Sequence, residues 1–301
     1  MVHLNTNADS LRVYEALASE VRLNIIDCLY EKECHVKELA ARLHLSNAVV
    51  SSHIRKLEDA GIIGSQMKRI DGGTYKYCYI KTEFMQIKLS PERPESLSVQ
   101  ELSIPIGQYT DIEAYPTCGI ASTKAMIGPY DNPASFMDPG RGEAGILWFA
   151  RGWVEYKLPN YLHRDESLHE IEISLELGSE APRVNERWPS DIRFALNNQP
   201  LGSWTSPGDF GKRRGRFTPE WWQSDVNQYG LLKVLRIKAS GTYADGQKIS
   251  DIGLSDIETN RMNWTLRIAA EDRSRGRGGL TIYGKGFGNY DQDLRVRIYY
   301  R

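Results

Sequence analysis

The chain has 301 residues, of which 41% are hydrophobic and 10% aromatic, so it is long enough for two domains with cores of their own. It contains no apolar run of about 18 residues, which argues against a membrane-spanning helix, and its start predicts no secretory signal. Lys and Arg number 38 against 39 Asp and Glu, and this balance excludes a protein that is basic over its whole surface. Four cysteines without a C-x-x-C pair predict a reducing compartment, so we expect a cytoplasmic protein.

A proline-containing segment at residues 90–96 has the character of a linker. Pro91 and Pro94 lack backbone donors and bias the residues before them away from helix. The sequence before this segment has the apolar spacing of helices, whereas strands and turns are predicted after it, and all seven tryptophans follow it. We therefore predict an α+β protein of two domains, residues 1–89 and residues 97–301.

The first domain is predicted to contain short helices followed by a β-hairpin. Apolar residues spaced along one face predict helices over residues 10–17, 20–30, 36–43 and 47–60. Ser19 and Ser46 are placed to cap the second and fourth helices with their hydroxyls, and Gly61 suits the left-handed residue after the fourth. Strands at 62–68 and 74–80, around a turn at 69–73, complete the order of a winged helix-turn-helix.

The fourth predicted helix presents a small, polar and cationic face. Val50, Ile54 and Leu57 recur at i, i+4 and i+7 and are predicted to face the core, which leaves side chains that fit a major groove about 12 Å wide. Residues 46–81 hold six Lys or Arg and three acids, a local charge of +3, as phosphate neutralisation requires. The predicted DNA-binding residues are Ser46, Asn47, Ala48, Ser51, Ser52, Arg55 and Lys56 of the helix and Lys68, Arg69 and Lys76 of the hairpin. The alternative is a helical bundle whose polar face is only solvated.

Four stretches of this domain resemble the ArsR/SmtB-type transcriptional repressors. They are Leu17–Ile26 (LASEVRLNII), Val36–Ala40 (VKELA), Ser46–Leu57 and Glu58–Ile63. The resemblance covers about residues 10–82. It implies a homodimer that binds a palindromic operator and releases it when an effector binds.

Two departures from that family bear on metal sensing and on dimerisation. Metal-sensing members carry a C-x-C pair before the third helix, where this chain has His35 and Lys37, and a lysine does not act as a thiolate ligand. We therefore expect no metal or cofactor, with Cys34, His35 and Cys78 left as an alternative partial site. The family closes its dimer with a helix after the wing, and residues 83–88 are too short for one. Dimerisation is expected to use the first helix and the second domain.

The second domain has the alternation of antiparallel strands. Apolar and polar residues alternate over residues 171–177, 192–196, 264–268 and 294–298. Many such strands, separated by Gly- and Pro-bearing turns over about 205 residues, predict an antiparallel β-sandwich of jelly-roll type. The sequence has no nucleotide-binding, hydrolase or metalloprotease motif, so we predict that the protein is not an enzyme. A glycosidase-like pair of carboxylates remains a rival interpretation.

Aromatic and amide residues gather in turns of the second domain. Indole faces beside carboxylates and amides suit a sugar, because rings pack against C–H groups while Asp and Asn bond hydroxyls. The predicted ligand-binding residues are Trp188, Asp191, Asn197, Trp204, Asp209, Trp221 and Trp222. The alternative is that these rings fill the space between two sheets.

These patterns together predict a DNA-binding regulator, most simply a repressor, controlled by a small molecule such as a sugar. Its expected partners are a double-stranded operator, that effector and a second copy of the chain, with no membrane. In the rival interpretation, the second domain is only a platform for protein interaction or dimerisation.

Overall fold

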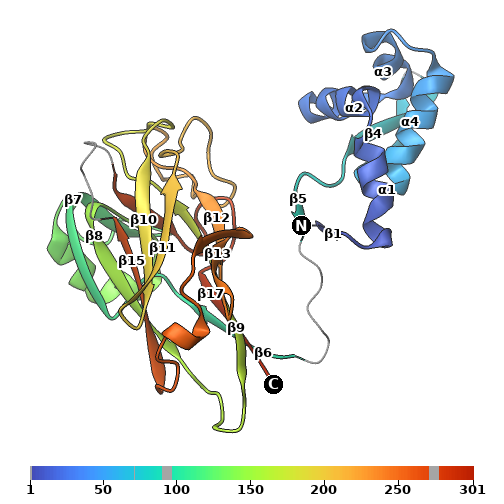
Figure 1. Cartoon of the computed structure of the whole chain (residues 1–301). Helices are drawn as coiled ribbons and strands as arrows, with labels where there is room; N and C mark the ends of the chain where they lie inside the picture. Colours follow the sequence, from blue (N-terminus) through green and yellow to red (C-terminus); the bar gives the residue numbers. More distant parts are fainter. Residues whose placement is uncertain (1, 71, 90–96, 271–277) are drawn as a thin grey trace. The chain divides into compact units, whose positions relative to one another are not determined.

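The computed structural model describes residues 2–70, 72–89, 97–270 and 278–301. The chain divides into two compact units, residues 1–93 and 94–301, which we term the N-unit and the β-unit (Figure 1). Within the described ranges, no helix is both long and apolar enough to cross a membrane.

The N-unit combines short helices with two small sheets. Its described helices are α1 (Ala8–Leu17), α2 (Glu20–Glu31), α3 (Val36–Arg42) and α4 (Asn47–Asp59). The antiparallel sheet consists of β2 (Cys34–His35), β4 (Gly73–Ile80) and β3 (Ile63–Ile70), and β1 (Val2–Asn5) pairs in parallel with β5 (Met85–Lys88). The predicted winged helix-turn-helix is confirmed. The sequence pattern did not predict β1, β2 and β5, because such short strands show no alternation to recognise.

Local hydrogen bonds explain where α2 and α4 begin and end. The Ser46 hydroxyl accepts the Val49 N–H at 3.3 Å and caps α4, as predicted. Ser19 precedes α2, but its hydroxyl makes no capping hydrogen bond; its backbone carbonyl accepts from the first turn instead, so that part of the prediction is wrong. After α4, Gly61 has a φ of +70°, the left-handed conformation that ends a helix at little cost.

The hairpin is tighter than the sequence predicted. Ile70 and Gly73 pair across β3 and β4, so two residues make the turn, and the predicted turn at 69–73 is too long. Gly72 has a φ of +78°, which lets the chain reverse in so short a space. Asp71, which the prediction also placed in this turn, lies outside the described residues.

The β-unit is built from antiparallel strands that form a sandwich-like, nearly closed sheet. Its described strands are β6 (Ser98–Ile104), β7 (Asp111–Ser122), β8 (Ala144–Pro159), β9 (Leu168–Gly178), β10 (Ser190–Leu196), β11 (Gln199–Ser206), β12 (Leu231–Lys238), β13 (Gly241–Ala244), β14 (Gln247–Ser250), β15 (Asn263–Ala270), β16 (Leu280–Tyr283) and β17 (Leu294–Tyr300). The sheet order is β11-β10-β15-β8-β16-β9-β12-β13-β14, with β7 also on β8 and with β17 between β9 and β6. Because β8 pairs with β15 through residues 152–159 and with β16 through 146–149, it belongs to both halves of the sheet. The predicted fold class is confirmed.

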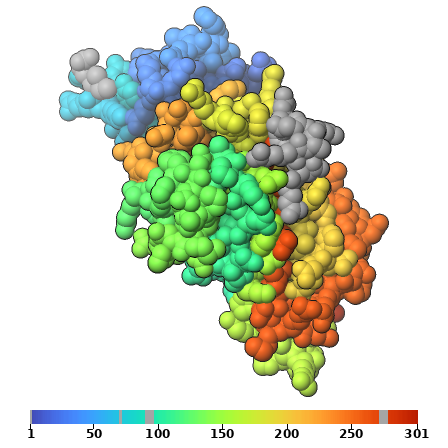
Figure 2. All heavy atoms as spheres, turned by 90° about the vertical axis from the view of Figure 1, so that its left-hand side faces the viewer, coloured from blue at the N-terminus to red at the C-terminus, as the bar shows by residue number. Residues whose placement is uncertain are grey.

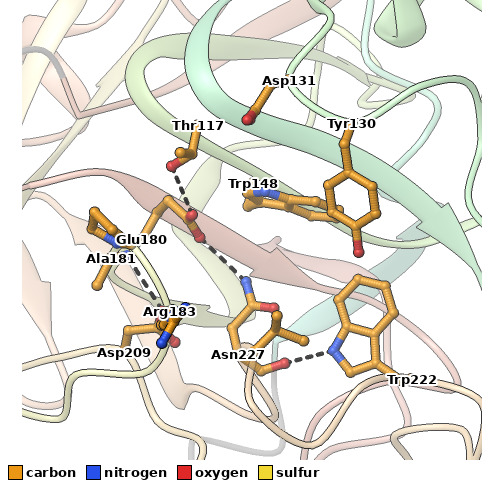
Figure 3. A pocket seen from close by; sticks show the side chains of 12 residues that line it. Thr117, Tyr130, Asp131, Trp148, Glu180, Ala181, Arg183, Asp209, Trp222 and Asn227 are labelled. Carbon is orange, nitrogen blue, oxygen red and sulfur yellow. Dashed lines mark hydrogen bonds between the residues drawn. The ribbon is translucent and has the colours of Figure 1, made fainter.

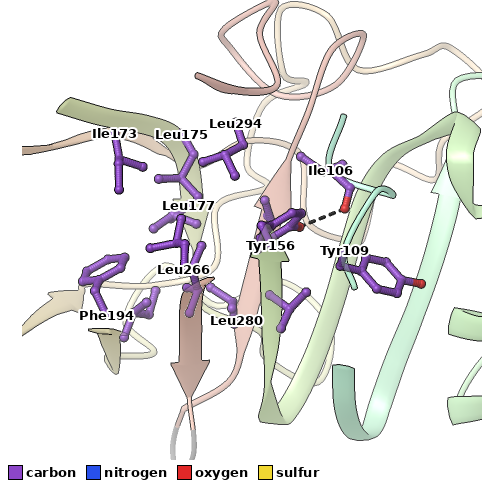
Figure 4. Packing of buried hydrophobic residues seen from close by; sticks show 14 of the residues in the cluster. Ile106, Tyr109, Tyr156, Ile173, Leu175, Leu177, Phe194, Leu266, Leu280 and Leu294 are labelled. Atoms are coloured by element: carbon purple, nitrogen blue, oxygen red, sulfur yellow. Dashed lines mark hydrogen bonds between the residues drawn. The ribbon is translucent and has the colours of Figure 1, made fainter. Parts of the chain in front are cut away.

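The main core of the β-unit lies between the two halves of this sheet. Leu175 and Leu177 of β9 lie in the same apolar cluster as Phe194 of β10 and Leu266 of β15, and none of the four is more than 2% exposed (Figure 4). Period-two alternation brings every second side chain of each strand into this layer. Burial of each such side chain stabilises the fold by about 1.5–3 kcal/mol.

A smaller apolar cluster covers the opposite face of β8 and β16. Leu147 and Phe149 of β8 enter the main core, so their neighbour Trp148 points to the other side. There it packs with Tyr283 of β16 and with Trp222 from the chain before β12. In the space-filling view, β7 and the chain that follows it to β8 (green) form an exposed part of this unit (Figure 2). The buried rings of Trp148, Trp222 and Tyr283 therefore lie on the face of the sheet away from the main core.

Candidate DNA-binding helix and candidate ligand pocket

α4 exposes a continuous polar face on the side away from the N-unit core. The three residues predicted to face inward are buried, with Val50 and Leu57 at 0% and Ile54 at 1% exposure. Residues 46–57 contain no Asp or Glu, so this part of the face carries no side chain that repels a phosphate; the exposed Asp59 lies one turn after Arg55, at the end of the helix. Every helix residue of the predicted DNA-binding set is exposed: Ser46, Asn47, Ala48, Ser51, Ser52, Arg55 and Lys56.

A buried arginine on α2 ties α4 to the first helix. The Arg22 guanidinium donates to the Glu15 carbonyl at 2.7 Å and to the Ala16 carbonyl at 2.5 Å, and it lies 3.4 Å from Nδ1 of His53 on α4. Burial and the charges of Arg22 and Lys56 lower the pKa of His53. Its imidazole is therefore neutral near pH 7 and adds no charge to the exposed face.

The predicted wing lysines are held in ion pairs. Lys68 pairs with Glu33, whose pKa that contact lowers. Lys76 lies 2.8 Å from Glu58; burial opposes ionisation of that carboxyl, but hydrogen bonds from Lys76 and Ser65 hold its pKa below the ordinary value. The count of +3 over residues 46–81 therefore overstates the free positive charge of the wing, because Glu33 comes from outside that range. Arg69 is exposed.

The residues of the alternative metal site are engaged in other contacts. Nδ1 of His35 accepts the Glu38 N–H at 3.2 Å and caps α3. Cys34 and Cys78 are buried and lie opposite each other on β2 and β4, and burial raises the pKa of Cys78 to about 11. Among the described residues, no three His, Cys, Asp or Glu side chains group closely enough to hold a metal ion.

The β-unit contains a pocket of about 150 Å³ beside the outer aromatic cluster (Figure 3). An engineered apolar cavity of about this volume holds a benzene molecule, so this pocket accepts roughly one six-membered ring. Its wall is drawn from β7, β8 and the chain segments that follow β7, β9 and β11 or precede β12. The lining residues are Thr117, Tyr130, Asp131, Trp148, Glu180, Ala181, Pro182, Arg183, Asp209, Trp222, Val226 and Asn227.

Two buried carboxyl groups lie in the wall of the pocket. Glu180 accepts hydrogen bonds from the Thr117 hydroxyl at 2.9 Å and from the Asn227 amide at 3.3 Å (Figure 3). Asp209, only 1% exposed, accepts one from the Ala181 N–H at 3.3 Å. Burial raises the pKa of Asp209 to about 8, and burial together with the Asp209 charge raises that of Glu180 well above its ordinary value.

Three aromatic rings form the other wall. The Trp148 ring lies 5.6 Å from that of Trp222 and 5.8 Å from that of Tyr130, between ring centroids. Trp148 rests on Gly119, its partner on β7, where a Cβ atom would lie 2.3 Å from the indole. Tyr130 is 49% exposed, so this ring lies where the pocket meets solvent. The rings provide flat apolar faces next to the acids.

Two of the seven predicted ligand-binding residues line this pocket, namely Asp209 and Trp222. Trp221 stacks edge-on against Trp222 with centroids 5.4 Å apart, but it is not part of the lining, and its indole N–H donates to the Thr123 carbonyl at 2.7 Å. Trp222 is 2% exposed and also fills the small cluster, so the predicted alternatives of pocket and core both apply to it.

The other four predicted residues lie outside the pocket and have structural contacts. Trp188 donates to the Gly278 carbonyl at 3.1 Å, and Trp204 packs against the Lys233 ammonium, 4.4 Å from the ring centre. Asp191 accepts from the Thr205 hydroxyl on the neighbouring strand. Asn197, with a φ of +51°, is a turn residue whose side chain bonds backbone atoms of residues 258 and 265. These residues were predicted to share a site because they lie close together along the chain. That criterion was wrong, because adjacent turns of a sandwich lie at opposite ends of its strands.

The sequence prediction did not include most of the pocket. Trp148 and Tyr130 lie before residue 150, far along the chain from the predicted cluster, and Glu180 follows directly on β9. Asn227 stands in an amide-containing stretch close to Trp222, and that nearness was the available signal. An acid at the end of an alternating strand was the corresponding signal for Glu180.

Comparison with known proteins identifies the N-unit. The profile described as "Bacterial regulatory protein, arsR family" matches residues 19–65. An uncharacterized HTH-type transcriptional regulator from Methanocaldococcus jannaschii is 37% identical over 76 residues, which cover 25% of this chain and 79% of that protein. The chain belongs to the ArsR family. Its N-unit is an ArsR-type DNA-binding domain of a transcriptional regulator.

Solved structures are similar to parts of this ArsR-family chain. The homodimeric winged helix-turn-helix domain of a possible ArsR-family regulator from Mycobacterium bovis is 29% identical, with a TM-score of 0.22, over 24% of this chain and 64% of that one, less than two thirds of its length. Reduced HlyU from Vibrio cholerae is 28% identical, with a TM-score of 0.23, over 25% of this chain and 76% of that one. A carbohydrate-binding module, CBM36 in complex with calcium and xylotriose, is 10% identical, with a TM-score of 0.27, over 66% of this chain and 98% of that module.

Proposed function

We propose that this ArsR-family protein is a one-component repressor whose operator binding is controlled by a small molecule held in the β-unit pocket. The observation that carries the proposal is a ring-sized pocket with acids and aromatic faces in the same chain as an ArsR-type DNA-binding domain. A domain that only joined copies of the chain would not need buried acids in such a pocket. The protein acts in the cytoplasm on its operator.

The exposed face of α4 reads the operator in this proposal. Asn47 is suited to adenine, while Ser51, Ser52 and Arg55 reach base edges or phosphates in the major groove. Lys68 and Lys76 contact flanking phosphates in place of their ion-pair partners Glu33 and Glu58. The loss of these ion pairs reduces the net contribution of each lysine to the affinity for DNA. A homodimer places two such helices on half-sites about 34 Å apart.

The effector belongs to the carbohydrate class in this proposal. The Trp148 and Tyr130 faces pack against C–H groups of a ring, and Asp131 and Asn227 bond its polar substituents. Ligand binding releases DNA if the operator-bound form has the weaker affinity for the effector. A difference of about 1–3 kcal/mol between the two forms suffices for a functional switch.

The test begins with an operator selected from random DNA by the purified full-length chain. Its affinity is measured by gel shift for the native chain, for Arg55→Ala and for Arg164→Ala, an exposed arginine of the β-unit that serves as the control. We expect selection of a palindrome, a loss of about ten-fold or more for Arg55→Ala and no change for Arg164→Ala. Equal affinity of all three proteins would contradict the assignment of α4.

The effector role is tested on the same operator. Monosaccharides that raise the unfolding temperature of the chain are added to the gel shift, since a ligand of the folded state stabilises it. Release of the operator by a stabilising sugar supports the proposal. A sugar that binds the pocket without changing operator affinity favours the β-unit as an interaction platform, and turnover of a chromogenic glycoside favours an enzyme.

A further inference from the structure

One acidic side chain in the pocket wall has a carboxyl oxygen that accepts no hydrogen bond from the described residues. Asp209 is 1% exposed, and its Oδ2 accepts the Ala181 N–H, but its Oδ1 has no hydrogen-bond partner among the described residues. A buried oxygen without a partner costs about 1–3 kcal/mol, so such groups are rare unless a ligand completes them. Asp209 lines the pocket, and a molecule bound there is within reach of it.

A second acid lies close enough to Asp209 to interact with it. Glu180 accepts hydrogen bonds from Thr117 and Asn227, and a further one from Thr281 also favours its ionised form; all three partners are neutral. The Asp209 and Asp131 charges act on Glu180 and oppose its ionisation. Among the described residues, the buried part of the pocket therefore brings acids together without a cation between them.

Arg183, the cation of the lining, does not neutralise Asp209 and Glu180. Arg183 is exposed, and in the part of the chain that the structure describes it forms no ion pair with Asp209 or Glu180. Among the described residues, the lining contains three acids, namely Asp131, Glu180 and Asp209, and one arginine, so acidic side chains outnumber cationic ones. An anionic ligand is disfavoured at the buried end of the pocket.

The aromatic wall favours the same ligand charge. The faces of Trp148, Trp222 and Tyr130 carry the negative part of the ring quadrupole, which attracts a cation within about 6 Å. Acids on one side and rings on the other make the arrangement that binds ammonium groups in many proteins. A neutral hydroxyl would also bond the free oxygen of Asp209, but it would not stabilise the ionised form of either carboxyl.

We propose that the pocket binds a small ligand with an ammonium group, seated between Asp209 and Glu180, with its C–H face on Trp148. The inference rests on the proposed function only in taking this pocket as the effector site. The ligand class is an amine of about five to twelve heavy atoms, which fits the volume, and both amino sugars and alkylamines have this chemistry.

Binding of an ammonium ion is coupled to proton release. Burial holds the pKa of Asp209 at about 8, so this carboxyl carries a proton at pH 7 in the free protein. A cation beside it favours the ionised form, and the proton leaves to the solvent. Glu180 and the Tyr283 hydroxyl lie close enough to Asp209 for its charge to affect them, Asp131 is a further acid of the lining, and Arg183 is the exposed cation. The heat of binding should therefore depend on the ionisation enthalpy of the buffer.

The experiment is calorimetric titration of the full-length chain with two matched pairs of probes. D-glucosamine is compared with D-glucose, and n-butylamine with 1-butanol; each pair differs in one amino group replaced by hydroxyl. We expect at least one amine to bind about ten-fold or more tightly than its neutral partner at pH 7, as charge-assisted bonds predict. The pair that shows the preference distinguishes an amino sugar from an alkylamine.

Variants assign the preference to the pocket. Asp209→Asn keeps the shape and removes the charge, and we expect the preference for the amine to fall below about three-fold. Glu180→Gln provides a second variant, and Asp191→Asn, an exposed acid outside the pocket, is the control that keeps the preference. Tryptophan fluorescence confirms that each variant is folded before it is titrated.

Defined outcomes overturn the inference. Equal or tighter binding of the neutral partners, no binding of either amine, or an amine preference that survives in Asp209→Asn would each do so. The gel shift separates this result from the proposed function. Amine binding without any effect on operator affinity keeps the inference and refutes the effector role, whereas operator release by D-glucose alone does the reverse.

Discussion

Replacement of Asp209 by asparagine should make the stability of the β-unit less dependent on pH. In the native chain, burial raises the pKa of Asp209 from 3.8 to about 8. Between these values the folded state holds a proton that the unfolded state has released, so raising the pH favours unfolding. The stabilising contribution is present below about pH 4 and is lost as the pH rises through about 8. An asparagine side chain does not titrate and removes this contribution.

The structure sets the size of the effect. Asp209 is 1% exposed, so solvent screening does not reduce the shift, and each pKa unit corresponds to about 1.4 kcal/mol. Between pH 5 and pH 8 the free energy of unfolding should fall by up to about 4 kcal/mol through this one group. Glu176, whose pKa burial raises to about 7, acts in the same direction in both proteins and cancels in the comparison. We expect the Asp209→Asn protein to lose about 2–4 kcal/mol less than the native chain.

Urea unfolding followed by tryptophan fluorescence measures this difference. All seven tryptophans lie in the β-unit, so the signal reports that unit alone. Curves are recorded at pH 5, 6, 7 and 8 for the native chain, for Asp209→Asn and for Asp191→Asn, an exposed control. If the native chain and Asp209→Asn lose the same free energy over this range, Asp209 is ionised in the folded state and the reasoning is wrong.

The remaining predictions concern the DNA-binding face and the aromatic residues. Arg55→Ala should lower operator affinity by about 1–3 kcal/mol in a gel shift, and an unchanged affinity removes this side chain from the interface. Lys68→Ala should reduce the slope of log affinity against log salt by about one, whereas Lys212→Ala, an exposed and ion-paired lysine of the β-unit, should leave it unchanged; identical slopes exclude a wing contact. Trp222→Ala should destabilise the β-unit by about 3–5 kcal/mol in thermal unfolding because the ring is 2% exposed, and the half-buried Trp188→Ala should cost less. Equal losses would contradict their different burial.

Local patterns in the sequence predicted the helices and the exposed face of α4. Val50, Ile54 and Leu57 are buried because a helix repeats every 3.6 residues, and that repeat is visible without any tertiary contact. Ser46 caps α4 through a hydrogen bond to a residue three positions away, which is also a local property. The partners of Lys68 and Lys76 were not predictable in this way, because Glu33 and Glu58 approach them only in the folded unit.

Alternation predicted the sandwich but not its second face. Period two shows that Leu147 and Trp148 point to opposite sides of β8, and it does not show which side another segment covers. Trp148 is buried because the chain that carries Trp222 folds over it. Residues 146–150 (ILWFA) are apolar without a break, as in a strand that is buried on both faces, but such a run does not show which segment covers the second face.

The sequence by itself determined the ArsR-type helix-turn-helix and the antiparallel class of the second unit, since these depend on contacts within a few residues or on short repeats. Only the tertiary structure decided the pocket. The pocket residues Thr117, Trp148, Glu180, Asp209 and Asn227 come from five separate segments, which lie together only in the folded β-unit. The charge states of Asp209 and Glu180 could not be predicted from the sequence either. Burial sets their pKa values, and a sequence does not show burial.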